Sequence, residues 1–87
     1  DDDKRKSANA LAEAFCLMII DSVMNEGRYM QALDMLDSME TVLNKTTNMP
    51  RTPQFYLQRI NIYYGFEEWD KVISISNECM KIHKEDA

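Results

Sequence analysis

The sequence predicts an all-α fold made of two antiparallel helical hairpins, four helices in all. Apolar residues recur at helical spacing through most of the chain, and no stretch alternates in the manner of a strand over more than a few residues. Turn-forming residues interrupt this pattern near Gly27 and Gly65, and a polar loop at 45–52 that contains Pro separates the two halves. Eighty-seven residues are enough for one domain with one modest core.

The bend near Asn25 organises the first hairpin. Asn25 and Gly27 can both adopt the left-handed backbone conformation in which helices commonly end. An apolar stripe then restarts at helical spacing, with Tyr29, Ala32, Leu33 and Leu36. We expect this stripe to face the helix that precedes the bend.

The first helix is expected to run from about Ser7, whose hydroxyl can cap the first turn, to about Asn25. Its apolar residues form two adjacent faces: Ala8, Leu11, Ala12, Phe15, Ile19 and Val23 on one, Ala14 and Met18 on the other. From Ala14 to Ile20 the helix is apolar all round, which a helix facing one neighbour does not need. We therefore expect cover from the second helix on one side, and from the second hairpin or another molecule on the other.

Residues 1–6 precede this helix and are expected to be a tag remnant or a disordered tail. The run Asp1-Asp2-Asp3-Lys4 resembles the end of an enterokinase-cleavable tag, and charged terminal runs are commonly solvated. Residues 7–87 then form a single helical domain.

The second helix is expected from about Arg28 to Asn44. Its main stripe continues to Leu43, and a flanking stripe consists of Met35, Met39 and Val42. The carboxylates Asp34, Asp37 and Glu40 oppose the main stripe, so we interpret them as the solvated side of the helix and not as a catalytic cluster.

The second hairpin has clear boundaries. Thr52 is the expected N-cap of the third helix, Pro53 its first residue and Gly65 its end. The fourth helix is expected from Trp69 to about His83. Its predicted apolar face consists of Trp69, Val72, Ile73, Cys79 and Met80, with Ile75 and Ile82 beside it.

Charge argues against a nucleic-acid partner. The net charge is -5, the pI is about 4.7 and no basic face is visible, whereas phosphate binding needs clustered Lys and Arg. The acidic residues concentrate between Glu13 and Glu40, where Arg28 is the only basic residue. This acidity favours a basic partner or a solvated polar face.

The residues for catalysis or metal binding are few, so we expect no enzyme, no cofactor and no metal site. The chain has one histidine, His83, four residues after Cys79. These two side chains can share a helix face, but a zinc site needs about four ligands, or three and a water.

Cysteine and hydropathy patterns predict a soluble protein inside the cell, in the cytoplasm. Cys16 and Cys79 are too few for a disulfide framework, although one bridge stays open. The longest uninterrupted apolar run, Ala14 to Ile20, is seven residues, far below the roughly 20 that span a bilayer. No signal peptide is visible, so no membrane partner is expected.

The two hairpins form an internal repeat with an offset of 40 residues, which places Tyr29 over Trp69 and Ala32 over Val72. The sequence Gly27-x-Tyr29-x-x-Ala32 resembles the turn of the tetratricopeptide-repeat (TPR) family, in which a small residue lets two helices approach and an aromatic ring wedges between them. The resemblance covers residues 13–84 and departs from the family pattern at Ile20, Met39 and Arg59.

This resemblance implies a fragment of a right-handed TPR-like solenoid, or a small bundle, that binds proteins. Some TPR proteins clamp a partner's C-terminal carboxylate with Lys and Asn, but the corresponding positions here hold Leu17 and Asp21, so that mode is not expected. Two repeats are fewer than a self-sufficient solenoid needs, which implies a neighbour.

We therefore expect a scaffold or adaptor module that binds a partner helix or an extended peptide. Two alternatives stay open: a small acidic chaperone or adaptor similar to the TPR-like chaperones of bacterial secretion systems, and a structural bundle that homodimerises through Ala14 to Ile20. Homo-oligomers and hetero-oligomers are both compatible with these hypotheses.

The partner is expected to contact the first hairpin. Flexible thioethers fill irregular cores and also line adaptable grooves. We assign Met18 and Met80 first to core filling, and Met35 and Met39 to partner contact. The full set of candidate partner-binding residues is Leu17, Met18, Asp21, Met35, Met39 and Val42.

Overall fold

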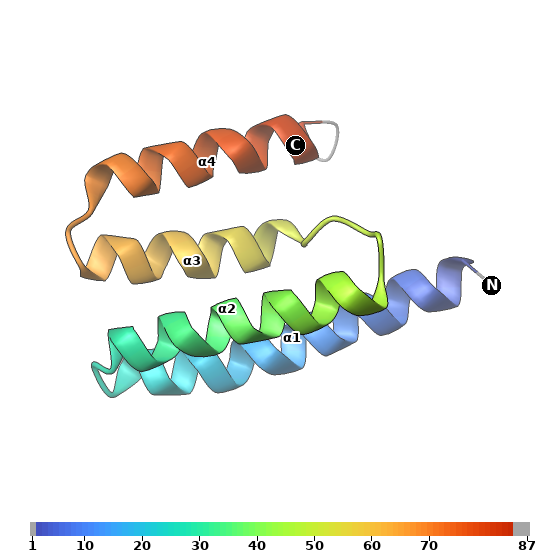
Figure 1. Ribbon diagram of the computed structural model, residues 1–87, viewed down its shortest axis with the longest axis horizontal. Helices are drawn as coiled ribbons and strands as arrows, with labels where there is room; N and C mark the ends of the chain where they lie inside the picture. Colours follow the sequence, from blue (N-terminus) through green and yellow to red (C-terminus); the bar gives the residue numbers. More distant parts are fainter. Residues whose placement is uncertain (1, 85–87) are drawn as a thin grey trace.

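The computed structural model describes residues 2–84, which contain four α-helices and no strand. The helices are α1 (Asp2–Asn25), α2 (Tyr29–Thr46), α3 (Pro53–Gly65) and α4 (Trp69–His83). Helices α1 and α2 form one antiparallel hairpin and α3 and α4 form a second (Figure 1). The prediction of an all-α fold with two helical hairpins is confirmed. Asp1 and residues 85–87, which belong to the predicted tail and domain, lie outside the described residues.

Helix α1 begins at Asp2, before the start predicted near Ser7. Residues 2–6 are helical and exposed, so the expectation of a disordered tail is wrong for them. Asp2 and Asp3 occupy the first turn, where negative charge is favourable because the helix dipole is positive there.

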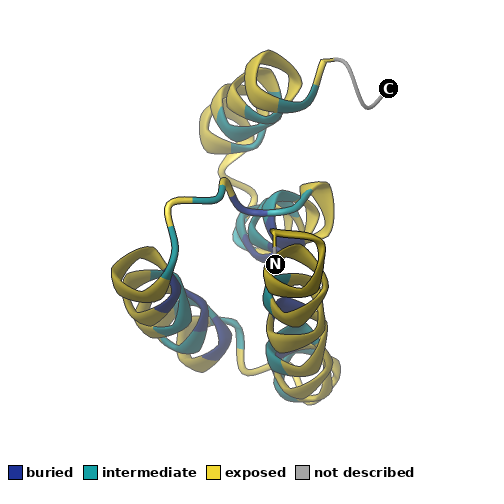
Figure 2. Cartoon of the chain, turned by 90° about the vertical axis from the view of Figure 1, so that its right-hand side faces the viewer, coloured by how far each residue is buried: buried dark blue, intermediate teal, exposed yellow. Residues whose placement is uncertain are grey.

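The core lies between the first hairpin and α3. Helix α3 packs against both α1 and α2, whereas α4 packs against no described helix except α3. Figure 2 shows buried residues in α1, α2, α3 and the loop before α3, and none in α4. The buried apolar cluster consists of Ile20, Ala32, Leu36, Leu43, Phe55 and Ile62. The fourth helix is therefore an outer layer on α3.

The two hairpin turns are copies of each other at the predicted offset of 40 residues. Gly27 has φ +80° and Glu67 has φ +60°, and they are the residues with positive φ among those described. In both turns the N–H of this residue donates to the carbonyl three residues earlier, at 2.8 Å in the first and 3.0 Å in the second. The equivalent N-cap residues, Arg28 and Glu68, have nearly the same backbone angles.

Gly65 ends α3 as predicted, but for a different reason. The left-handed residue of this turn is Glu67, so Gly65 is not needed for its backbone conformation. A Cβ at Gly65 would instead lie 2.7 Å from the ring of Tyr29. The ring of Tyr29 also packs edge-on against Phe66, with centroids 6.0 Å apart. Gly65 thus makes room for an aromatic ring between the two hairpins.

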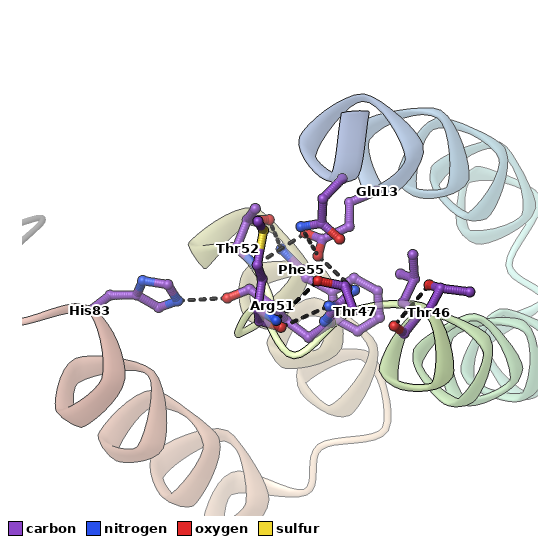
Figure 3. Close-up of polar contacts among 10 residues, drawn as sticks. Glu13, Thr46, Thr47, Arg51, Thr52, Phe55 and His83 are labelled. Carbon is purple, nitrogen blue, oxygen red and sulfur yellow. Dashed lines mark hydrogen bonds and ion pairs between the residues drawn. The ribbon is translucent and has the colours of Figure 1, made fainter. Parts of the chain in front are cut away.

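A buried ion pair fixes the start of α3 to α1 (Figure 3). Arg51 Nη1 lies 2.8 Å from Glu13 Oε1, and the two side chains are only 3% and 1% exposed. Glu13 Oε2 also accepts a hydrogen bond from the backbone N–H of Thr52 at 3.1 Å. Thr52 is the N-cap of α3, accepting from Phe55 N, with Pro53 at the first helical position, as predicted. One carboxylate therefore holds both the loop and the helix start.

A second charged link joins α2 to α3. Arg59 donates to Asp37 at 2.5 Å and to Glu40 at 2.9 Å. Two members of the carboxylate group predicted to be solvated are thus paired with α3. Asp37 is exposed, as predicted, whereas Glu40 is half-buried, so that interpretation is wrong for Glu40. Asp34 is exposed, as expected.

The matched turns predict opposite effects for changes to and from glycine. Gly27→Ala is expected to lower the free energy of unfolding by about 1 kcal/mol, because non-glycine residues are strained at positive φ. Glu67→Gly should raise it by roughly 0.5 kcal/mol, since it relieves the same strain. Urea unfolding followed by circular dichroism measures both. Glu67→Ala is the control and should be nearly neutral; a loss of stability in Glu67→Gly would contradict this account.

The two arginines of α3 and its loop are expected to differ in importance. Arg51→Met leaves the buried Glu13 carboxylate unpaired and should cost about 3–5 kcal/mol of unfolding free energy. Arg59→Met breaks a pair whose acids are partly exposed and should cost about 1 kcal/mol or less. The double change Glu13→Leu, Arg51→Met is expected to recover much of the loss. Equal losses for both arginines in chemical denaturation would refute the assignment.

Candidate functional site

An apolar groove between α3 and α4 is the main candidate site. Its volume is about 570 Å³. The residues that line it include Pro53, Leu57, Ile60, Ser76, Met80 and His83. Leu57 and Met80 are 55% and 61% exposed, respectively, so the apolar walls are open to solvent. Hydrophobic residues dominate this groove, and such surfaces commonly bind other proteins.

Helix α3 packs on the first hairpin between α1 and α2, and we call this surface of the first hairpin the seat of α3. The groove lies at the equivalent position on the second hairpin. Moving these six lining residues back by 40 positions gives Glu13, Leu17, Ile20, Leu36, Glu40 and Leu43. Residues at all these positions contact α3 or share the core with it. Glu13 and Glu40 pair with its arginines, the Leu17 carbonyl accepts from Gln58, and the other three belong to the core cluster. The groove therefore occupies, on the second hairpin, the position that a helix fills on the first.

Cys79 lies in the groove as a protonated thiol. Burial raises the pKa of Cys79, and the nearby negative charge of Glu78 raises it further. Burial is also the main cause of the raised pKa of Tyr56, to which Glu78 and Glu40 add. A raised thiol pKa gives a weak nucleophile at neutral pH, so Cys79 is suited to packing against an apolar ligand.

His83 closes one end of the groove by a structural contact. Its Nε2 lies 2.6 Å from the carbonyl oxygen of Arg51 (Figure 3). Its ring packs edge-on against Tyr56. Cys79 and His83 both line the groove, as their spacing predicted. Within residues 2–84 no group of three or more potential metal ligands comes together. Cys16 and Cys79 are not joined by a disulfide in this fold.

A second candidate surface is the outer face of α1. Its inner face carries Glu13 and Ile20, which are buried, and Leu17, which packs against the core. Leu11, Phe15 and Met18 lie on the opposite side and are 72%, 61% and 64% exposed. The second hairpin covers the side of α1 that contains Ile20, through α3, and leaves these three positions uncovered, so cover by another molecule stays the open alternative for them.

The outer positions of α4 also differ from the prediction. Val72 and Cys79 are half-buried as expected, but Trp69, Ile73 and Met80 are largely exposed. Only α3 covers α4, and the side facing α3 includes Ile75 and Ser76. Met80 on α4 and Met18 on α1 are both largely exposed, so their assignment to core filling is wrong.

The six predicted partner-binding residues do not form one surface. Leu17 and Met35 pack against the core, which uses them for folding. Met39 is half-buried, and Met18, Asp21 and Val42 are exposed. None of the six lines the α3/α4 groove. Sequence reasoning missed this groove. The repeat locates it only when the position of α3 on the first hairpin is also known.

Helix α1 is the one described helix that is long and apolar enough to cross a membrane by length and composition. Core helices of soluble proteins and signal sequences meet the same criterion. In this fold α1 supplies Glu13 to the buried ion pair and Ile20 to the core.

Comparison with known proteins adds no relative to this geometry. No protein-family model matches the chain, and no curated protein or solved structure matches it. The assignment of a function therefore depends on the two apolar surfaces and on the repeat that relates them.

Proposed function

We propose that the chain is a non-enzymatic protein-binding module, TPR-like in its arrangement, whose α3/α4 groove receives an amphipathic helix of a partner. The observation that carries this proposal is the seat of α3 on the first hairpin, because the groove has the same position in the second hairpin. What fills that seat is a helix. The same backbone arrangement with an open apolar lining suits the same kind of ligand.

The seat of α3 also suggests which residues a bound helix presents. Phe55 and Ile62, seven residues apart, enter the core from one face of α3. A ligand of the groove should carry large apolar residues on one face of a helix, where they can meet Leu57, Ile60 and Met80. The helical spacing of such residues favours a helix over the extended segment.

The proposal moves the main binding surface from the first hairpin to the second. Leu17 and Met35 are poor candidates for partner contact because they pack against the core. A chaperone that shields a client helix would use the same groove, so that alternative is a special case of the present proposal. The homodimer through Ala14 to Ile20 would use α1 and not this groove.

Helical peptides selected for binding should depend on the groove. The probe is a displayed library of amphipathic helices, selected against the folded chain. Leu57→Glu and Met80→Glu are expected to weaken the selected peptides on the order of 30-fold each, because they place a charge against an apolar ligand. Val42→Glu is the matched control, since Val42 is similarly exposed at 59% but lies on α2. Binders unaffected by the groove changes, or no helical binders, would overturn the proposal.

The thiol of Cys79 provides an independent measurement. In a Cys16→Ser variant, Cys79 is the sole thiol, and its reaction with a disulfide reagent should be slow at neutral pH. The rate should rise with pH through a midpoint above the ordinary cysteine pKa, because burial and Glu78 disfavour the thiolate. A selected peptide should slow the reaction further by covering the groove. Full reactivity in the presence of saturating peptide would show that the peptide binds elsewhere.

A further inference from the structure

We propose that the helix that fits the α3/α4 groove is α1 of a second copy of this chain, so that copies associate head to tail. This inference rests on the proposed function of the groove and names its occupant. The outer face of α1 and the groove are two apolar features that the described fold leaves open. Each corresponds to one half of an interface that the chain already forms internally.

The outer face of α1 is the repeat equivalent of the face by which α3 enters its seat. On α3 and the residue preceding its N-cap, that face consists of Arg51, Phe55, Gln58, Arg59 and Ile62. Moving back by 40 residues gives Leu11, Phe15, Met18, Ile19 and Ser22. The first four are the exposed large apolar residues of α1, whereas Ser22 stands at the position of the buried Ile62, so contact with the groove depends on the first four. Thus α1 of one copy has the face with which to enter the groove of another.

The outer face of α1 and the groove differ from the internal interface in the same way, because both are apolar where the internal interface is charged. In the internal interface, Arg59 of α3 pairs with Glu40 at 2.9 Å. The equivalent residues of the open surfaces are Ile19 on α1 and Met80 in the groove. A charged pair in the closed interface is thus replaced by an apolar pair in the open one.

The buried ion pair of the internal interface also has two apolar residues at its equivalent positions. Arg51 pairs with Glu13 at 2.8 Å inside the molecule. The equivalent positions are Leu11 on α1 and Pro53 in the groove. If only one half had become apolar, docking would bury an unpaired charge at several kcal/mol of cost. Because both halves are apolar at both positions, α1 and the groove are complementary to each other.

The aromatic residue of the internal interface, Phe55, has an aromatic equivalent on α1, Phe15. Phe55 is 1% exposed in the seat of α3, whereas its equivalent Phe15 is 61% exposed on α1. Phe15 therefore supplies the aromatic anchor that the groove of another copy receives. Buried aromatic anchors of this kind commonly dominate the energy of an interface.

Such an interface is heterologous, because α1 of one copy meets α3 and α4 of the next. Each added copy presents a free α1 face at one end and a free groove at the other. Assemblies therefore grow into open chains or close into rings. A symmetric dimer that pairs α1 with α1 through Ala14 to Ile20 would stop at two copies and leave both grooves empty.

A mixing experiment tests the direction of this interface. Analytical ultracentrifugation of the folded chain should show a weight-average mass that rises with concentration beyond that of a dimer. Phe15→Glu removes the α1 anchor and Met80→Glu removes the groove, and each alone should weaken association on the order of 30-fold or more. An equimolar mixture should form a 1:1 heterodimer that grows no further, because it has one intact α1 face and one intact groove.

A charge rescue tests the register. Ile19→Arg copies Arg59 and Met80→Glu copies Glu40, so each single change should block association and the double variant should restore it. Val42→Glu is the control and should associate like the unchanged chain, since Val42 belongs to neither surface. Circular dichroism confirms that each variant is folded; the three replaced side chains are all exposed.

Several results would overturn the inference. A chain that stays monomeric at high concentration, or a mixture of the two Glu variants that stays monomeric, excludes head-to-tail docking. Persistent dimerisation of Met80→Glu supports the symmetric α1 dimer instead. If self-association is absent while selected peptides still bind the groove, only this inference fails; if the groove binds neither, the proposed function fails with it.

Discussion

The fold depends on how α3 is held in the angle between α1 and α2. This helix contributes Phe55 and Ile62 to a core whose other members come from the first hairpin. Its start is fixed by the buried carboxylate of Glu13, which meets both Arg51 and the N–H of Thr52. A buried charge pair is seldom a strong source of stability, but it is costly to break and therefore defines one register. The apolar cluster supplies the attraction, and the ion pair fixes where α3 begins.

From that arrangement follows the difference between the two hairpins. The same backbone unit occurs twice, with equivalent turns at Gly27 and Glu67. The first unit has its groove filled by α3, and the second has its groove open. Filled and open versions of one interface in a single chain allow a direct comparison of their residues. Charged pairs mark the filled version and apolar pairs the open one.

Local signals in the sequence were sufficient for much of this fold. The Thr52 cap, Pro53, and the stripe containing Ala32 and Leu36 predicted helix boundaries and one buried face, because caps and periodicity act over a few residues. Glu67 could not be recognised as a left-handed residue from its type. Only its place opposite Gly27 in the repeat indicates that conformation.

Contacts between residues that are distant in the sequence could not be predicted. Glu13 and Arg51 are ordinary charged residues in the sequence, and only the approach of the loop to α1 makes them a buried pair. Arg59, which departs from the TPR pattern, is accommodated by Asp37 and Glu40. Helix α1 is apolar all round, so its periodicity could not indicate which side faces the core. The candidate site was misplaced for the same reason, since the groove exists only after α4 has packed on α3.

The single-neighbour packing of α4 has a consequence for dynamics. Because α4 contributes no buried residue and packs against no described helix except α3, with His83 adding one contact to the loop at Arg51, we expect it to detach while the three-helix core stays folded. Its amide hydrogens should then exchange faster than those of α1 to α3. Any helix in the groove contacts α4 as well as α3, so the measured affinity includes the free energy of ordering α4. Binding in the groove and the ordering of α4 are therefore thermodynamically coupled.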